Sequence, residues 1–354
     1  MYYKGLFSEK VKILIVKLSA LGDVVQTLPS LSLLKKVFPE SKIDWVIDKR
    51  NAEILEKHPY INKILVFSNN TFFSFKNLKK FLKDLRSEEY DVVIDYQGLL
   101  KSGIITGLSK AKYKIGFANH REGSPFFYTL KLPPYDKNLH AVKRYLFLTK
   151  KVIEILGKPK DLIYFEEIPE PIFSSEILNK RLKFIKRPYI VFVPSARWET
   201  KWWPFSHWEK LIELCKDDLA KNFDIFITGS SSEINLKSWA EEMEKKYPYI
   251  YSLVGKLSLK ELIILIKDSK ALVSVDTGPM HIAEALKKPV VALFGPTSPE
   301  RTGPWAGDFK VIRSSLSCSP CFKKKCKKLE CMFEIKPEEV KNALEELLIK
   351  HYSL

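Results

Sequence analysis

The chain has 354 residues, of which 45% are hydrophobic, and a formal net charge of +17 at pH 7. This length exceeds that of one ordinary hydrophobic core and predicts two domains. Lysines interrupt the apolar stretches near the N-terminus, and no segment reaches the roughly 18 apolar residues that a membrane span requires. We therefore expect no signal peptide and no transmembrane helix, and a cytoplasmic protein that is soluble or peripheral to a membrane.

The positive charge is concentrated in the first half of the chain. Residues 1–165 hold 29 Lys and Arg against 16 Asp and Glu, a net charge of +13, whereas residues 166–354 hold 30 against 26, or +4. A lysine-rich proteome would explain the total but not this asymmetry. The N-terminal half is therefore expected to meet an anionic partner, such as a membrane surface, an acidic glycolipid or a nucleic acid. Since no nucleic-acid-binding module is recognisable, nucleic acid is not expected.

Strand-like and helix-like patterns alternate in the first half, which is typical of an α/β domain with a parallel, doubly wound sheet. The expected strands are Val11–Val16, Ile43–Ile47, Ile64–Phe67, Val92–Asp95 and Tyr113–Gly116. The expected helices are Val24–Val37, Asn51–Lys57, Leu78–Ser87 and His140–Leu156. Four prolines between residues 157 and 188 indicate an interdomain connection. We place an N-terminal domain at 1–165 and a linker at 166–188.

The same alternation returns in the second half. The expected strands are Tyr189–Val193, Ile225–Thr228, Ile250–Ser252, Ala271–Val275 and Val290–Phe294. The expected helices are Trp208–Asp217, Ile234–Lys246, Leu259–Lys267 and Pro337–His351. These patterns predict a C-terminal domain at 189–336 and a final helix at 337–354. Two Rossmann-like domains of similar size are expected to face a cleft.

The segment around Asp276 predicts a phosphate site. A β-branched run ends at Asp276, Thr277 and Gly278 form a turn, and Pro279 stands where the first turn of a helix tolerates proline. Free N–H groups at a helix start, beside the carboxyl end of a strand, suit a phosphate group. An ordinary strand–helix–strand crossover with a small-residue loop is the alternative.

A second candidate site lies at residues 17–31, KLSALGDVVQTLPSL. Asp23 stands at the start of a helix, where a carboxylate can cap the helix and interact favourably with its dipole. Gly22 leaves the loop open to a substrate, so Asp23 could instead act as a general base that stays ionised at neutral pH. The sequence leaves both interpretations open.

Two further loops follow strands of the second half. The loop PSARWETKWWP carries Arg197 and Lys201, two cations that suit a diphosphate, and its tryptophans are expected to pack. In GSSSE, Glu233 either binds a pair of ribose hydroxyls or caps the next helix.

Four cysteines near the C-terminus, Cys318, Cys321, Cys326 and Cys331, have the spacing C-x2-C-x4-C-x4-C. The leading C-x2-C is compatible with a structural zinc site. The second pair lacks this spacing, and neighbouring lysines would offset the thiolate charge. Reduced or disulfide-paired cysteines are the alternative, although disulfides are unusual in a mesophile's cytoplasm. The lone Cys215 is expected in the core.

Several long motifs stand in order between Lys12 and about Val340: KLSALGDVVQTLPSL, YDVVIDYQGLLKSG, REGSPFFY, HAVKRYL, PSARWETKWWP and DTGPMHIAEALKKPVVALFGPTSP. Together they resemble the ADP-heptose lipopolysaccharide heptosyltransferases, GT-B-fold glycosyltransferases of family 9, and most of all heptosyltransferase I. The resemblance implies inverting transfer of L-glycero-D-manno-heptose from ADP-heptose to the Kdo of Kdo-lipid A. It also implies an enzyme of lipopolysaccharide inner-core synthesis, peripheral on the cytoplasmic face of the inner membrane, that needs no cofactor for catalysis.

The resemblance assigns roles to individual residues. Asp23 matches the family's catalytic base, and Lys201 matches the lysine that steadies the departing diphosphate. Glu233 matches the position expected to bind the ribose. The donor motif DTG-x-x-H matches Asp276, Thr277, Gly278 and His281.

Basic residues of the N-terminal half are expected to bind the anionic acceptor. Arg121 matches one such residue of the family, and the others should lie near Lys76, Lys79, Lys80 and Lys83. Helical spacing places these lysines on one face, with Phe75, Leu78, Leu82 and Leu85 on another. A solvated helix face is the alternative to a contact with Kdo carboxylates, lipid A phosphates or the membrane.

Two other functions remain open at this point. One is a later family 9 transferase that adds heptose to heptose, because the cysteine-rich segment is more typical outside the heptosyltransferase I branch. The other is a nucleotide-sugar epimerase with the same two-domain architecture.

Overall fold

A computed structural model describes residues 10–68, 70–158, 168–178 and 180–352. The predicted domain limit at residue 165 and the first residues of the predicted linker lie outside this described part. The chain divides into two compact units, Met1–Glu176 and Ile177–Leu354. The short helix α7 (Ser175–Leu178) contains the division.

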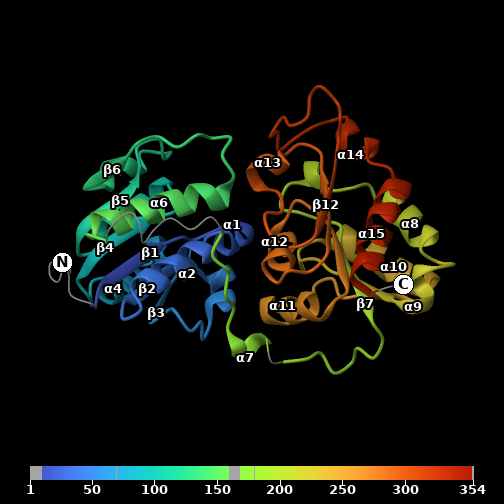
Figure 1. The fold of residues 1–354 in the computed structure, drawn as a ribbon, viewed down its shortest axis with the longest axis horizontal. Coiled ribbons are helices and arrows are strands. Elements are labelled where there is room, and N and C mark those ends of the chain that lie inside the picture. Colours follow the sequence, from blue (N-terminus) through green and yellow to red (C-terminus); the bar gives the residue numbers. More distant parts are fainter. Residues whose placement is uncertain (1–9, 69, 159–167, 179, 353–354) are drawn as a thin grey trace, which may run out of the picture. The chain divides into compact units, whose positions relative to one another are not determined.

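The first unit contains a six-stranded parallel sheet (Figure 1, blue to green). Its strands are β1 (Lys12–Val16), β2 (Lys42–Asp48), β3 (Lys63–Phe67), β4 (Tyr90–Asp95), β5 (Ala111–Phe117) and β6 (Leu130–Leu132), in the order β3-β2-β1-β4-β5-β6. The order reverses between β1 and β4. Because the strands are parallel, the loops after β1 and β4 leave the same edge at this reversal, which is where open α/β sheets bind ligands.

Most helices of the first unit lie between these strands along the chain, and α6 (Ala141–Ile155) follows the last one. Those between the strands are α1 (Leu21–Val25), α2 (Leu28–Val37), η1 (Lys49–Leu55), α3 (Asn70–Phe73), α4 (Phe75–Leu85), α5 (Leu100–Leu108) and η2 (Ser124–Phe127), where η denotes a 3-10 helix. The single helix predicted at Val24–Val37 is wrong, since turn residues Gln26 and Thr27 separate α1 from α2. Pro29 at the start of α2 explains the break, because proline donates no backbone hydrogen bond and is best placed in a first turn.

The second unit repeats the architecture with its own six-stranded parallel sheet (Figure 1, yellow to red). Its strands are β7 (Tyr189–Val193), β8 (Asp224–Ile227), β9 (Ile250–Ser252), β10 (Ala271–Val275), β11 (Val290–Phe294) and β12 (Phe309–Arg313), in the order β12-β11-β10-β7-β8-β9. Here the order reverses between β7 and β10. The loops that follow these two strands therefore form the corresponding candidate ligand site of this unit.

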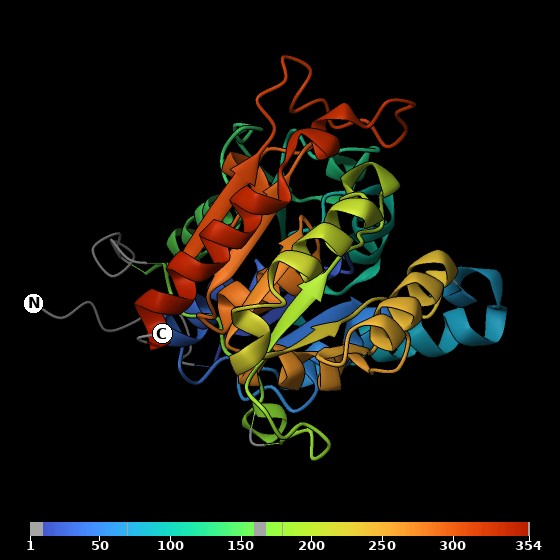
Figure 2. The ribbon, with the colours of Figure 1, turned by 90° about the vertical axis from the view of Figure 1, so that its right-hand side faces the viewer.

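Its helices are η4 (Glu199–Lys201), α8 (Phe205–Leu214), α9 (Leu219–Asn222), α10 (Ile234–Lys246), α11 (Leu259–Asp268), α12 (Gly278–Ala285), α13 (Pro299–Thr302), α14 (Glu330–Glu334) and α15 (Pro337–Tyr352). Helix α15 runs beside α8 and beside strands β11 and β12 (Figure 2, red beside orange). Within the described residues, no helix has the length and apolar character needed to cross a bilayer.

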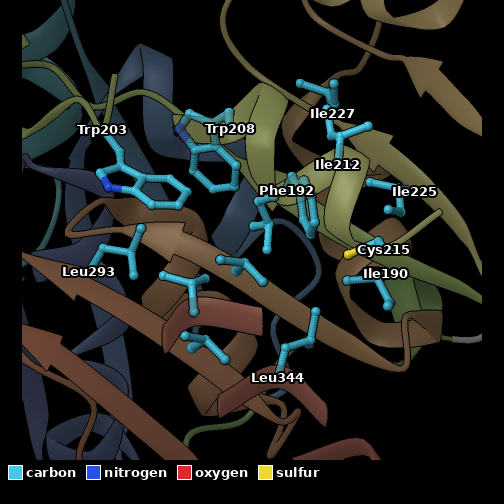
Figure 3. Packing of buried hydrophobic residues seen from close by; sticks show 14 of the residues in the cluster. Ile190, Phe192, Trp203, Trp208, Ile212, Cys215, Ile225, Ile227, Leu293 and Leu344 are labelled. Carbon is cyan, nitrogen blue, oxygen red and sulfur yellow. The ribbon is translucent and has the colours of Figure 1, made fainter. Parts of the chain in front are cut away.

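A large apolar cluster holds the second unit together (Figure 3). Phe192 of β7 packs against Trp208 with 5.2 Å between ring centres, and Trp208 lies edge to face with Trp203 at 5.0 Å. Cys215 belongs to this cluster and is fully buried, which confirms its expected place in the core. The cluster includes side chains of β7 and β10, so it packs against the two strands whose following loops form the candidate site.

Candidate active site

The loop after β1 is tied down from three directions. The Gln97 side-chain oxygen, from the loop after β4, accepts the backbone N–H groups of Leu18 and Ser19 at 3.1 and 2.9 Å. The Asn51 side chain donates to the Leu18 carbonyl at 3.0 Å, and the Trp45 indole donates to the Lys17 carbonyl at 3.0 Å. The backbone that leads to Asp23 is therefore held by contacts distant in sequence.

Both carboxylate oxygens of Asp23, in the first turn of α1, have hydrogen-bond donors. Oδ2 accepts the Ala20 N–H at 3.1 Å, and Oδ1 accepts the Tyr145 hydroxyl from α6 at 2.9 Å. The Lys17 ammonium lies 3.7 Å from Oδ1. The side chain of Asp23 keeps 36% of its surface exposed, so it caps the helix and still presents an open edge.

The charges around Asp23 favour its ionised form. Burial against the protein raises the pKa of Asp23, but Lys17, the Ala20 N–H, the Tyr145 hydroxyl and Arg144 lower it, and the net pKa lies below the ordinary value. A carboxylate that is ionised and open on one side can accept a proton from a bound hydroxyl. This geometry is compatible with the predicted base, whose catalytic role stays a prediction.

The second loop at this edge is organised by buried Asp95. One oxygen accepts the N–H groups of Gln97 and Gly98, both at 2.9 Å, and the other accepts the hydroxyls of Ser102 and Tyr128 at 2.8 and 2.7 Å. Gly98 has a φ of +66°, and a Cβ there would lie 2.4 Å from the His120 ring. Asp95 thus fixes the position from which Gln97 holds the Asp23 loop.

Arg121 lies beside this loop. Its N–H donates to the Gly98 carbonyl at 2.9 Å, and the residue is exposed. The other predicted acceptor residues, Lys76, Lys79, Lys80 and Lys83, are all exposed on α4. Phe75 is wrongly predicted on the apolar face, since it is 83% exposed, and Phe81 and Leu85 are the buried residues of α4.

In the second unit, the loops after β7 and β10 meet through an ion pair. The Lys201 ammonium donates to Asp276 Oδ2 at 2.7 Å and to the Asp276 carbonyl at 3.2 Å. The Lys201 and Asp276 side chains are 17% and 6% exposed. Lys201 Nζ also lies 5.0 Å from the centre of the Trp198 ring. The structure thus brings together two of the predicted donor-site residues, while Arg197 is exposed on the same loop.

The turn after Asp276 begins α12, with Thr277 as the residue before the helix and Gly278 as its first residue. His281 is buried, and its Nδ1 lies 3.1 Å from Oε2 of Glu284. Glu284 also accepts the N–H of Trp305. Burial raises the pKa of Glu284 despite its contacts with His281. His281 therefore supports the turn from inside the protein.

Glu233 directly precedes α10, and its Oε2 accepts the Ser230 N–H at 2.6 Å. This bond closes the GSSSE loop on itself. Of the loop tryptophans, Trp203 is fully buried, and the Trp202 indole donates to the Ala196 carbonyl at 2.6 Å. Packing is confirmed for these two, whereas Trp198 lies beneath the ammonium groups of Lys201 and Lys324.

The four clustered cysteines are free thiols, with Cys318 and Cys326 exposed and Cys331 buried. Burial and the nearby Cys318, Cys321 and Cys326 raise the pKa of Cys331, so these groups interact electrostatically. Within the part of the chain that the structure describes, no three His, Cys, Asp or Glu side chains are arranged to hold a metal ion. A structural zinc stays a prediction.

One known protein family matches most of this chain. The model of glycosyltransferase family 9 (heptosyltransferase) matches residues 78–332, which is most of the chain. The chain belongs to this family. The predicted enzyme class, a glycosyltransferase, is therefore confirmed, and the epimerase alternative is not supported.

Relatives of this family 9 enzyme cover nearly its whole length. Lipopolysaccharide heptosyltransferase 1 of Pseudomonas aeruginosa is 28% identical over 96% of this chain and 98% of its own. Lipooligosaccharide heptosyltransferase 2 of Haemophilus ducreyi is 31% identical over 85% of this chain and 88% of its own. The E. coli heptosyltransferase WaaC, solved with ADP, has a TM-score of 0.79 at 27% identity, covering 95% of this chain and 100% of its own. The same enzyme is solved with ADP-2-deoxy-2-fluoro heptose. The predicted GT-B fold is confirmed.

Several residues at the candidate site were not predicted from the sequence. Lys17, Gln97, Arg144 and Tyr145 all lie within quoted motifs, but none was assigned a role. Of these four, only Lys17 could have been recognised from the sequence. A lysine directly after a buried strand must find hydrogen-bond or charged partners in the interior. The Tyr145 contact joins residues 122 positions apart and leaves no local pattern.

Proposed function

We propose that this enzyme transfers L-glycero-D-manno-heptose from ADP-heptose to the Kdo of Kdo-lipid A, with inversion at the sugar's anomeric carbon. The observation that carries this proposal is the Asp23 carboxylate, fixed on one side by Tyr145 and Ala20 and open on the other. One base and one displacement suit an inverting transfer. Similarity to heptosyltransferase 1 over nearly the full length supports the choice of donor and acceptor.

The donor would bind at the edge of the second sheet. Lys201 would meet the diphosphate, and the N–H groups at the start of α12 would hold its oxygens, helped by the helix dipole. Arg197 would add a second cation, and Glu233 would meet the ribose. The related WaaC is solved with ADP, which supports an ADP-linked donor.

The acceptor would bind at the edge of the first sheet, where Asp23 would take the proton of the attacking hydroxyl. Arg121 lies on the neighbouring loop and would meet the Kdo carboxylate. The exposed lysines of α4, together with the +13 charge of residues 1–165, would attract lipid A phosphates and the cytoplasmic face of the inner membrane. The enzyme would then work as a peripheral membrane protein.

A transfer assay tests this function. Purified enzyme is mixed with ADP-heptose and Kdo-lipid A, and both ADP release and product mass are followed. We expect ADP release together with a product heavier by one heptose. Absence of transfer to Kdo-lipid A, despite tight ADP binding, would contradict the proposed acceptor or donor sugar.

The role of Asp23 is tested with Asp23→Asn. General-base catalysis contributes about 10²–10⁴-fold, so transfer should fall by that factor while ADP binding is retained. Asp136→Asn is the matched control, because the exposed Asp136 carboxylate also accepts a local backbone N–H, that of Asn138, at 2.8 Å. Equal loss of transfer and ADP binding would assign Asp23 a structural role only.

A second candidate function is transfer of heptose to a heptosylated core. The observation that favours it is the 31% identity to lipooligosaccharide heptosyltransferase 2, which exceeds the 28% to heptosyltransferase 1. Transfer that requires a heptosylated acceptor would select this function. The greater coverage by heptosyltransferase 1 makes Kdo-lipid A our first choice.

A further inference from the structure

Lys17 is the most deeply buried lysine at either candidate site. It follows β1 directly and keeps only 2% of its surface exposed. Burying an ammonium group is costly unless other groups replace its water. The proposed chemistry gives Lys17 no role, so its position requires an explanation.

The contacts of Lys17 lead to Asp23. Its ammonium donates to the Tyr145 hydroxyl at 2.9 Å and to the Tyr96 carbonyl at 3.2 Å. The Tyr145 hydroxyl in turn donates to Asp23 Oδ1 at 2.9 Å, and the ammonium itself is 3.7 Å from that oxygen. Hydrogen bonds therefore run in one direction, from the buried cation through the phenol to the carboxylate.

We propose that Lys17 is a positioning residue, which acts through Tyr145 to orient the Asp23 carboxylate and to keep it ionised until it takes the acceptor's proton. The proposal rests on the proposed function for the identity of the base. The other part of the proposal, that the buried Lys17 cation controls the ionisation of the Asp23 carboxylate, rests only on the contacts described above.

Other charged and titratable groups face this cluster. Arg144 lies next to Tyr145 on α6, Asp95 ends β4, and His120 and Tyr135 lie in the loops after β5 and β6. Burial and the neighbouring Asp23 raise the pKa of Tyr145 well above its ordinary value, so its hydroxyl stays protonated and can donate. Burial lowers the pKa of Lys17, an effect that Asp23 and Asp95 oppose.

In the proposed transfer, the acceptor oxygen forms a bond to the anomeric carbon as the bond from that carbon to the diphosphate breaks. ADP leaves with the electron pair, and the acceptor's proton moves to Asp23. Lys17 exchanges no proton in this step. Its charge favours the carboxylate before the step, and the Tyr145 hydrogen bond leaves the exposed edge of Asp23 facing outward.

The experiment measures the ionisation of Asp23 directly. Full-length protein labelled with ¹³C at the aspartate carboxyl groups is titrated by NMR, and Asp23→Asn identifies the signal. An opposite charge at about 4–6 Å lowers a carboxyl pKa by roughly 1–3 units. We therefore expect the Asp23 titration to move upward by about one pH unit or more in Lys17→Met. The acid limb of kcat/KM for transfer should move by the same amount.

Two variants keep the result interpretable. Tyr145→Phe retains Lys17 and deletes one hydroxyl. It should therefore raise the pKa at which Asp23 titrates, lower kcat and leave the KM for ADP-heptose unchanged. It serves in place of Lys17→Met if that variant does not fold. Lys12→Met, at the other end of β1, removes a lysine that pairs with Glu88 at the surface and should leave the pKa of Asp23 unchanged.

The outcomes separate this inference from the proposed function. An Asp23 titration that is unmoved in Tyr145→Phe and in folded Lys17→Met would overturn the inference, even if Asp23→Asn is inactive. Full transfer by Asp23→Asn would refute the assignment of the base. If the natural enzyme transferred no heptose, the proposed function would fail, and the NMR titration would still decide whether Lys17 controls Asp23.

Discussion

Replacing Lys201 by methionine tests the donor site, because this lysine pairs with Asp276 and is also expected to meet the diphosphate. The pair is 2.7 Å long, and its two side chains are mostly buried. The substitution Lys201→Met keeps most of the side-chain volume and removes the charge. It therefore leaves the Asp276 carboxylate without its partner at the place where the diphosphate would bind.

The expected magnitudes follow from this geometry. Breaking a fully buried ion pair costs about 3–5 kcal/mol, so a pair with some solvent contact should cost about 2 kcal/mol of unfolding free energy. Loss of a charge-assisted hydrogen bond to ADP costs about 1.5–3 kcal/mol, or roughly 10- to 150-fold in affinity. Repulsion by the uncovered carboxylate adds to this loss. The double variant Lys201→Met/Asp276→Asn removes the repulsion, so it should be more stable and bind ADP better than Lys201→Met.

Urea unfolding and calorimetric titration with ADP measure the two effects. Six of the seven tryptophans lie in the second unit, so tryptophan fluorescence reports mainly on its unfolding. Lys210→Met is the matched control, since Lys210 forms an exposed pair with Glu213 that should contribute less than about 1 kcal/mol. Unchanged ADP affinity in Lys201→Met would refute the diphosphate role. Equal affinity in the single and double variants would refute repulsion by Asp276.

Three other predictions address separate parts of the chain. Burial lowers the pKa of His58 to about 4, below an unfolded value of about 6.5, so stability falls as the pH drops through this interval. The free energy of unfolding should be about 2 kcal/mol lower at pH 5 than at pH 7, and His58→Gln should not show this difference, as measured by urea unfolding at both pH values. Replacing the four α4 lysines by glutamate should abolish co-sedimentation with anionic vesicles, whereas replacing Lys237 and Lys245 of α10 by glutamate should not. Equal loss of vesicle binding in both variants would indicate a general charge effect. If the cysteine cluster holds zinc, metal analysis should find one zinc per chain and none in Cys318→Ser/Cys321→Ser; a metal-free natural protein would exclude the site.

The central strands could be predicted from the sequence because they are buried on both faces. Strands β7, β10 and β11 have the predicted bounds, since each is a short apolar run that is buried along its whole length. Strand β9 also has the predicted bounds, although it lies at the edge of its sheet and exposes Tyr251. Strands β6 and β12 were missed, and both expose side chains such as Leu130 and Phe309. These two edge strands are paired with β5 and β11, and their exposed local sequence does not specify that pairing.

Helix α5 was missed for a related reason. It contains Gly103 and Gly107, which lower helix propensity, so the local sequence does not predict a helix here. In the structure these glycines allow close packing, because a Cβ at either position would lie within 3.0 Å of Ser124 or Phe127. The helix therefore depends on tertiary contact with η2, and only the folded chain shows that contact.

At the candidate site, too, features set by the local sequence could be predicted, and contacts between residues far apart in the sequence could not. The places of Asp23, Lys201 and Asp276 at the sheet edges could be predicted because each stands in or beside a loop that follows a buried strand, where parallel sheets place their ligands; their roles stay predictions. Their partners could not be predicted in the same way. Gln97 reaches the Asp23 loop across 78 and 79 positions, and Lys201 reaches Asp276 across 75. Such pairs become neighbours only because the strand order reverses at these positions.

The two lysine–aspartate pairs suggest why similar sheets can take different roles in one reaction. In the first unit the lysine is buried and the acid is open, with exposures of 2% for Lys17 and 36% for Asp23. In the second unit the lysine is the more exposed partner, at 17% for Lys201 and 6% for Asp276. The more exposed member of each pair is the one that would meet a substrate in the proposed reaction, and the more buried member lies against it as its charged partner. A partly exposed carboxylate suits removal of a proton, and an ammonium that is the more accessible partner suits a departing diphosphate, so exchanging which partner is more buried changes the chemistry that the same sheet edge can support.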